Sequence, residues 1–291
     1  MTTAAQWVAG ARPRTLGAAI APVLVGTAVG YAAADRVIWW RALAALVVAL
    51  ALQVGVNYAN DYSDGVRGTD DVRAGPLRLT ASQVATPGAV RTAAALAFGL
   101  AAVVGLALAI VVDLRLLIVG AAAIAAGALY TGGPRPYGYS GFGELSVLVF
   151  FGLVATAGST YVQIERVPAA AWWGAVAVGL LACAILLANN IRDIHGDRVA
   201  GKRTLAVRLG ATPARLLYAG CLVVAFVAVG AIAVTSTAWA LLGWLALPLA
   251  IRPLQLVLTR TDPPSLVAAL VGTSRLELAV AMLVTVGLVL A

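Results

Sequence analysis

The feature that most constrains this chain is a succession of long apolar runs separated by short polar segments. A helix needs about 20 apolar residues to cross the roughly 30 Å hydrocarbon core of a bilayer. Nine runs reach or approach that length, so the sequence predicts an all-α, polytopic membrane protein with about nine transmembrane helices. The runs cover residues 16–34, 42–59, 93–112, 116–130, 145–163, 169–189, 216–235, 238–251 and 276–290.

Composition agrees with this prediction. Hydrophobic residues make up 62% of the 291 residues, charged residues only 11%, and the mean hydropathy is +0.96. A soluble domain carries about 25% charged residues, so a soluble enzyme, a disordered chain and a secreted disulfide scaffold are excluded. No stretch resembles a soluble domain or a long linker, and we therefore expect residues 1–291 to form one intramembrane domain.

The basic residues indicate an orientation. Sixteen of the 20 Lys and Arg residues fall in alternate segments on the side of the N-terminus, and four fall on the other side. Cytoplasmic segments of membrane proteins carry the excess of Lys and Arg. We expect a multi-pass protein of the cell membrane with its N-terminus inside and its C-terminus outside. The excess of Lys and Arg in these segments also explains the net charge of +8, which therefore does not indicate nucleic-acid binding.

Two segments on the predicted cytoplasmic side, 57–71 and 189–204, are longer and more polar than the others. If the second and sixth helices continue a turn or two past the membrane core, each presents amides and acids on one face. The similar patterns, four helices apart, hint at an internal duplication. The residues on these faces are Asn57, Asp61 and Asp64 in the first segment, where Asn60 precedes Asp61, and Asn190, Asp193 and Asp197 in the second.

Four carboxylates brought to one point need cations, because two like charges about 4 Å apart repel by about 4 kcal/mol at an effective dielectric of about 20. Asp and Asn oxygens are hard ligands that favour Mg²⁺ over zinc or copper. Mg²⁺ usually shares its shell with substrate phosphates, so we expect a diphosphate site with about two Mg²⁺ ions. Cationic side chains that could offset the remaining charge are Arg67, Lys202, Arg203 and Arg135.

Other interpretations of the acids stay open at this level. One Asn-Asp-x-x-Asp motif alone is usually a solvated loop, and it is the pair at equivalent helix ends that favours a site. Intramembrane acids also mark ion paths, so a cation transporter is an alternative, although these acids cluster at one face. A CDP-alcohol phosphotransferase would also use aspartates and Mg²⁺, but its Asp-Gly-x-x-Ala-Arg signature is missing.

The paired motifs resemble the UbiA superfamily of intramembrane prenyltransferases, and the resemblance covers essentially the whole chain. Within it, the sequence looks like the branch that prenylates 1,4-dihydroxy-2-naphthoate in menaquinone synthesis. The common first motif has a third aspartate where this chain has Gly68; the menaquinone branch resembles this variant, and Asp70 or Asp71 could replace the missing ligand. The most similar segments are 11–16, 57–71, 130–144 and 189–210.

The resemblance implies transfer of a polyprenyl group from a polyprenyl diphosphate to the naphthoate, with release of diphosphate and CO₂, giving demethylmenaquinol. It implies that the four aspartates, with Asn57, Asn60 and Asn190, hold the Mg²⁺ ions. An allylic carbocation would form and be shielded by tyrosine rings. The shielding candidates are Tyr58, Tyr62 and Tyr130, and the acceptor-binding candidates are Arg12, Arg14, Tyr137 and Tyr139.

Several of these assignments have simpler alternatives. Arg12 and Arg14 could be interfacial anchors, and His195, inside the second motif, is more simply a solvated histidine. The acceptor pocket is not defined by the sequence. The alternative function is therefore a UbiA-type enzyme for 4-hydroxybenzoate, homogentisate, haem or a phosphosugar. In either case the partners are small molecules and membrane lipid.

Overall fold

The computed structural model describes residues 2–68 and 77–291, and within these ranges the regular structure is entirely helical. The α-helices are α1 (Ala4–Gly10), α2 (Gly17–Ala34), α3 (Trp39–Val66), α4 (Pro87–Val111), α5 (Leu116–Leu129), α6 (Gly143–Val147), α7 (Gly158–Ile164), α8 (Ala169–Val199), α9 (Leu205–Leu209), α10 (Ala211–Thr235), α11 (Leu247–Thr259) and α12 (Pro263–Val289). The other helical segments are η1 (Pro13–Thr15), η2 (Tyr137–Ser140), η3 (Leu148–Ala157) and η4 (Ala238–Ala246).

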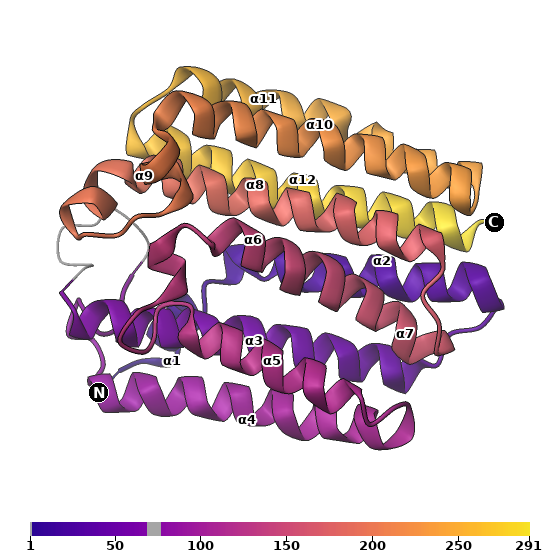
Figure 1. The fold of residues 1–291 in the computed structure, drawn as a ribbon, viewed down its shortest axis with the longest axis horizontal. Helices are drawn as coiled ribbons and strands as arrows, with labels where there is room; N and C mark the ends of the chain where they lie inside the picture. Colours follow the sequence, from indigo (N-terminus) through magenta and orange to yellow (C-terminus); the bar gives the residue numbers. More distant parts are fainter. Residues whose placement is uncertain (1, 69–76) are drawn as a thin grey trace.

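The long helices run side by side, and the two chain termini lie at opposite ends of the bundle (Figure 1). Among the described residues, eight helical segments are long and apolar enough to cross a membrane, and α5 is a shorter ninth. This confirms the predicted fold class and the count of about nine helices. At 1.5 Å per residue, the 14 residues of α5 cover only about 21 Å.

Several helices extend beyond their apolar runs. α3 continues to Val66 and α8 to Val199, so the first motif is helical through Asp64 and the second through Asp197. α12 begins at Pro263, well before the apolar run at 276–290, and therefore contains Arg275 as well as Glu277. The acids and amides of the two motifs, from Asn57 to Asp64 and from Asn190 to Asp197, are thus held on helices rather than on loops.

Small residues let the central helices approach closely. α8 packs against α10, η3, α12 and α2. A Cβ on Gly152 of η3 would lie 2.8 Å from Cα of Gly179 on α8, and a Cβ on Gly26 of α2 would lie 2.3 Å from the carbonyl oxygen of Thr156. Helices in membranes associate through such close contacts, because the lipid offers no hydrophobic drive between them.

The fifth span changes its helical type along its length. Between α6 and α7, the ten residues of η3 form a π-helix. Segments of this kind are rare and are frequently found at functional sites. Phe150, Phe151 and Val154 of η3 line the internal cavity described below, together with residues of α6 and α7.

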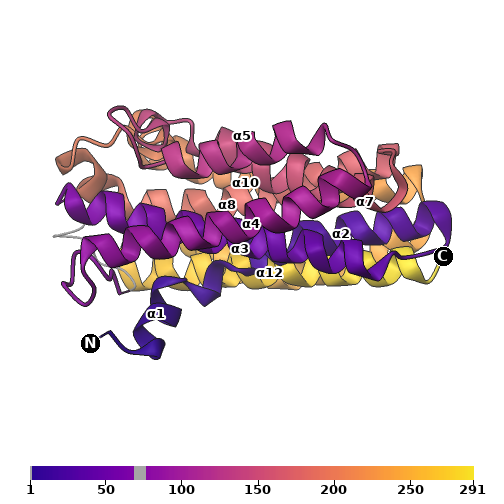
Figure 2. The ribbon, with the colours of Figure 1, turned by 90° about the horizontal axis from the view of Figure 1, so that it is seen from below.

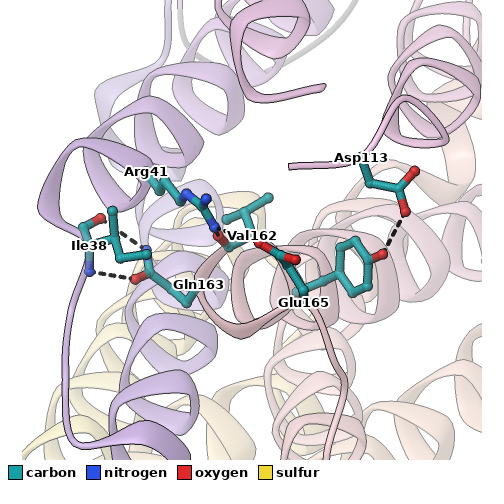
Figure 3. Close-up of polar contacts among 7 residues, drawn as sticks. Ile38, Arg41, Asp113, Val162, Gln163 and Glu165 are labelled. Carbon is teal, nitrogen blue, oxygen red and sulfur yellow. Dashed lines mark hydrogen bonds and ion pairs between the residues drawn. The ribbon is translucent and has the colours of Figure 1, made fainter. Parts of the chain in front are cut away.

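At the end of the bundle away from the polar motifs, side chains tie the connecting segments to α7 (Figure 3). Arg41 donates to the carbonyl oxygen of Val162 at 2.8 Å and lies 3.3 Å from a carboxylate oxygen of Glu165. The hydroxyl of Tyr161 donates to Asp113 at 2.6 Å. These contacts join the start of α3 and the α4–α5 connection to one helix.

Candidate active site

α3 and α8 carry their polar motifs to the same end of the bundle (Figure 1). The four predicted aspartates are almost fully buried, with exposed fractions of 1% for Asp61, 3% for Asp64, 8% for Asp193 and 6% for Asp197. Burying four carboxylates is costly unless each is paired or hydrogen-bonded. Their partners therefore indicate what this end of the molecule does.

Tyr139 and Lys202 connect the two motifs. The hydroxyl of Tyr139 donates a short hydrogen bond to Asp64, and the ammonium of Lys202 lies 3.2 Å from the other Asp64 oxygen. Lys202 also lies 4.6 Å from the centre of the Tyr139 ring, and its backbone N–H donates to the carbonyl oxygen of Asp197 at 2.7 Å. The backbone N–H of Arg203 donates to the backbone carbonyl oxygen of Tyr139 at 2.8 Å. The segment after α8 and the loop after α5 thus meet at the end of α3.

The second motif has its own partners. Arg192 binds both carboxylate oxygens of Asp193 at 2.7 Å. The amide nitrogen of Asn190 donates to Glu144 at 2.9 Å, and Glu144 is 7% exposed. Arg192 and Glu144 were not predicted as site residues. Glu144 lies in one of the segments that carry the family resemblance, but only the fold shows that it faces α8.

Asp61 differs from the other three aspartates. One of its carboxylate oxygens accepts the backbone N–H of Leu79 at 2.8 Å, and the other accepts that of Thr80 at 2.9 Å. Both donors belong to the segment that precedes α4. Asp61 therefore fixes a neighbouring stretch of backbone in this structure. Asp70 and Asp71, considered as replacements for the missing third aspartate, lie outside the described residues.

A mostly apolar cavity of about 360 Å³ begins beside these motifs and runs into the bundle. On α3 its lining extends from Asn60 to Ala45, which corresponds to about 22 Å along the helix axis. The walls come mainly from α2, α3, α4, α5, α6, η3, α7 and α8. The polar side chains at the end near the motifs are Arg12, Asn57, Asn60, Tyr130, Tyr137 and Asn189.

The predicted tyrosines fall into two groups. Tyr130 and Tyr137 line the cavity and meet edge to face, with ring centres 5.5 Å apart. Burial raises the pKa of the Tyr137 hydroxyl above its ordinary value of about 10, so this side chain is neutral at physiological pH.

Tyr58 and Tyr62 are not among the described residues that line the cavity. The hydroxyl of Tyr58 donates to the carbonyl oxygen of Trp7 at 2.8 Å, which places it beneath α1. Tyr62 lies 6.0 Å from the guanidinium carbon of Arg91, measured from the ring centre. The structure thus separates Tyr130 from the other two candidates for shielding a carbocation.

The predicted cationic residues are also spread over different positions. Arg67 donates to the carbonyl oxygens of Thr131 and Gly133, and its guanidinium lies 5.7 Å from the Tyr139 ring centre. Arg12 lines the cavity, at a backbone φ of 55°. The others, Arg14, Arg135, Arg203 and also His195, have exposed side chains at this end of the molecule.

Comparison with known proteins identifies the family. A model of the UbiA prenyltransferase family matches residues 19–271. The chain belongs to the UbiA prenyltransferase family. Two solved structures show the same fold: the apo structure of a UbiA homolog from Aeropyrum pernix K1, and a UbiA homolog from Archaeoglobus fulgidus bound to DMAPP and Mg²⁺. The first has a TM-score of 0.70 at 16% identity and covers 94% of this chain and 97% of its own. The second has a TM-score of 0.62 at 14% identity, covering 97% and 99%.

This UbiA-family protein is also similar in sequence to curated relatives. A Mycobacterium tuberculosis protein named 1,4-dihydroxy-2-naphthoate octaprenyltransferase is 53% identical over 253 residues, which are 87% of this chain and 86% of the relative. An Escherichia coli protein of the same name is 38% identical over 98% of this chain and 95% of the relative.

The donor atoms at the end of the UbiA bundle fit a hard divalent cation. Asp64, Asp193 and Asp197 supply carboxylates from two helices, and Asn60 and Asn190 supply amides nearby. The described ranges contain no preformed group of three or more His, Cys, Asp or Glu side chains that could hold a metal ion. Mg²⁺ is commonly bound by one or two protein carboxylates together with substrate phosphates. Carboxylates that come from two separate helices are therefore compatible with Mg²⁺.

Proposed function

We propose that this protein transfers a polyprenyl group from a polyprenyl diphosphate to 1,4-dihydroxy-2-naphthoate, releasing diphosphate and CO₂ and forming demethylmenaquinol. The observation that carries the proposal is the apolar cavity that begins beside buried carboxylates and a buried lysine. A polyprenyl diphosphate has the matching structure, with a charged head and a long apolar tail. The naphthoate acceptor is taken from the names of the relatives.

The cation site would be shared by the two motifs. The residues that would hold Mg²⁺ are Asp64, Asp193 and Asp197, with Asn57, Asn60 and Asn190. Bound Mg²⁺ would supply positive charge that neutralises the diphosphate leaving group. The oxygens of Asp64 and Asp193 are held by side-chain donors, which a cation and a substrate can displace. Both oxygens of Asp61, the fourth predicted ligand, are held by backbone N–H groups, and Asp61 is considered separately below.

The chain's own cations and aromatic rings contribute the remaining chemistry. Lys202 is buried next to Asp64, where its ammonium is available to diphosphate oxygens, and Arg67, Arg135 and Arg203 add positive charge around it. As the C–O bond of the substrate breaks, positive charge develops on the allylic carbon at the head of the cavity. The neutral rings of Tyr130 and Tyr137 stabilise that charge through their π faces.

The acceptor binds at the polar end of the cavity in this proposal. Arg12 lines that end, and a guanidinium can hold a carboxylate through two parallel hydrogen bonds. The ring carbon that bears the carboxyl group attacks the allylic carbon, a C–C bond forms, and the carboxyl group leaves as CO₂. Charge is balanced without an added proton, because the electron pair released with CO₂ restores the aromatic ring.

The proposal includes a location. The basic residues favour a cytoplasmic position for the end of the bundle that carries the motifs, with the protein in the cell membrane. The apolar tail would remain within the thickness of the bilayer, in contact with membrane lipid.

A direct assay tests the proposed function. Purified protein in lipid is given Mg²⁺, polyprenyl diphosphates of several lengths and a panel of aromatic acids, and the products are identified by mass. We expect a prenylated naphthoquinol that lacks the carboxyl group. Product from 4-hydroxybenzoate or homogentisate alone would reject the naphthoate assignment, and absence of any prenylated product would reject the prenyltransferase assignment for this chain.

A further inference from the structure

Asp61 and Asp64 lie on the same helix but have different partners. The carboxylate of Asp64 contacts Tyr139 and Lys202, at the junction of the two motifs. The carboxylate of Asp61, which is 1% exposed, accepts two backbone N–H groups at 2.8 and 2.9 Å. A carboxylate that accepts two such bonds satisfies donors that would otherwise be buried without partners. The two aspartates therefore have different functions in this structure.

The segment held by Asp61 packs firmly against α3. Leu79 is fully buried, and its carbonyl oxygen accepts the N–H of Ala85 at 3.0 Å, which closes the segment into a turn. Thr80 lies directly over Gly65, where an added Cβ would be 2.6 Å from the Thr80 side chain. Asp61 thus binds the backbone of a compact stretch, 79–85, between α3 and α4.

The N-terminal helix rests on the same stretch. Gly10 of α1 contacts Leu79 so closely that an added Cβ would lie 2.6 Å from the leucine side chain. At the other end of α1, the hydroxyl of Thr2 donates to the carbonyl oxygen of Val84 at 2.7 Å. Figure 2 shows α1 projecting below the bundle, away from the long helices. Stretch 79–85 therefore helps to hold α1 in place, together with Tyr58 of α3, whose hydroxyl donates to the carbonyl oxygen of Trp7.

Arg12 follows α1 by two residues and lines the cavity. Its left-handed backbone conformation, at φ 55°, is uncommon for a residue with a side chain, so the chain around it must be held in place. Asn57 supplies one tether by donating to the carbonyl oxygen of Ala11 at 2.9 Å. The packing of Gly10 on Leu79 supplies another.

We infer that Asp61 is a positioning residue rather than a metal ligand. Its carboxylate fixes stretch 79–85, that stretch supports α1, and α1 sets Arg12 at the polar end of the cavity. The function of Asp61 is then to support binding of the acceptor carboxylate. The last step rests on the proposed function, whereas the first two concern only the packing of this chain.

Hydrogen exchange tests the packing steps without any substrate. In Asp61→Asn, one oxygen that accepts a backbone N–H is replaced by an amide group that cannot. We expect amides in stretch 79–85 and in α1 to exchange about tenfold faster than in the wild type. The matched control, Asp64→Asn, should leave the exchange of both segments unchanged. Unchanged exchange in Asp61→Asn would overturn the inference whatever the protein's substrates are.

Kinetics test the last step. In Asp61→Asn, the KM for the naphthoate should rise about tenfold, while the Mg²⁺ concentration that gives half-maximal rate stays within about twofold of the wild-type value. In Asp64→Asn, the Mg²⁺ dependence should shift instead. A Mg²⁺ shift in Asp61→Asn as large as that in Asp64→Asn would overturn the inference. A wild-type protein inactive toward the naphthoate would reject the proposed function and leave the exchange result to decide the packing steps.

A second variant separates position from charge. Gly10→Leu places a large side chain against Leu79 and leaves every carboxylate intact. It should reproduce the rise in the KM for the naphthoate and the faster exchange of α1, again without a change in Mg²⁺ dependence. Wild-type kinetics in Gly10→Leu together with faster exchange of α1 would contradict the link from α1 to Arg12.

Discussion

At the scale of single residues, the buried pair of Lys202 and Asp64 is the most consequential contact at the candidate active site. Lys202 is 5% exposed and Asp64 3%. Placing two charges out of water is costly, and breaking such a pair costs about 3–5 kcal/mol because one charge is left without compensation. A pair of this kind is a weak source of stability. Its position between the two motifs is better explained by a charged substrate that exchanges partners with it.

Asp64→Asn and Asp193→Asn should each lower turnover by about 100-fold or more, because an anionic ligand for the cation is lost while the side-chain shape is kept. Activity of the wild type should depend on Mg²⁺ and disappear in EDTA. Turnover is measured on variants whose folding and insertion have been verified by thermal denaturation. Asp113→Asn, at the far end of the bundle, is the control and should retain activity. Full activity in either site variant would contradict the diphosphate site.

Tyr130 should act through its ring rather than its hydroxyl. Cation–π stabilisation in a desolvated site amounts to about 2 kcal/mol, which corresponds to roughly a 30-fold change in rate. We therefore expect Tyr130→Phe to keep most of the turnover and Tyr130→Leu to lose about 30-fold. Single-turnover kinetics at saturating substrate measure the effect. Equal losses in the two variants would show that the hydroxyl is the important group.

At the scale of elements, the crossing of η3 and α8 determines whether the cavity keeps its shape. Gly152→Ala adds a Cβ that would lie 2.7 Å from the carbonyl oxygen of Ala175 and 2.8 Å from the Cα of Gly179. Backbone must move to admit it, at a cost of about 1–3 kcal/mol. We expect a lower midpoint of thermal denaturation in detergent. Gly220→Ala has no atom within 4 Å of the new Cβ and should be neutral or slightly stabilising. Equal stability of the two variants would contradict the tight crossing.

Much of this architecture could be predicted from the sequence because hydropathy reports membrane spans directly. The continuation of α3 and α8 through Asp64 and Asp197 was a condition of the sequence interpretation, in which acids and amides fall on single helix faces, and the structure meets that condition. The π-helix could not be predicted, because hydropathy records composition and not the register of backbone hydrogen bonds.

The hydrogen-bond partners of the acids could not be predicted from the sequence, for a different reason. Glu144 is hydrogen-bonded to Asn190, which lies 46 residues away in the sequence. Asp61 is hydrogen-bonded to Leu79, which lies 18 residues away. Residues so far apart are brought together only by the packing of helices. The predicted function of each acid therefore rested on residue type, which is the same for Asp61 and Asp64 although their surroundings differ.

At the scale of the whole molecule, the positions of the termini and the basic residues predict one orientation in the membrane. The termini lie at opposite ends of the bundle, which requires an odd number of crossings (Figure 1). Arg203→Cys, exposed at the end with the motifs, should react with an impermeant thiol reagent only after cells are opened. Ser236→Cys, exposed between α10 and η4, should react in intact cells. The native Cys183 and Cys221 are buried and should give little background. The reverse labelling pattern would overturn the orientation.

The central claim is a prenyl transfer in which the acceptor loses its carboxyl group, and one measurement tests it most directly. Dihydroxynaphthoate carrying a radioactive carboxyl carbon is supplied with polyprenyl diphosphate and Mg²⁺, and released gas, released diphosphate and membrane product are counted together. The account predicts that labelled CO₂ and diphosphate appear in equal amounts and that the prenylated product carries no label. Prenylated product that retains the label would contradict attack at the carboxyl-bearing carbon and, with it, the naphthoate assignment.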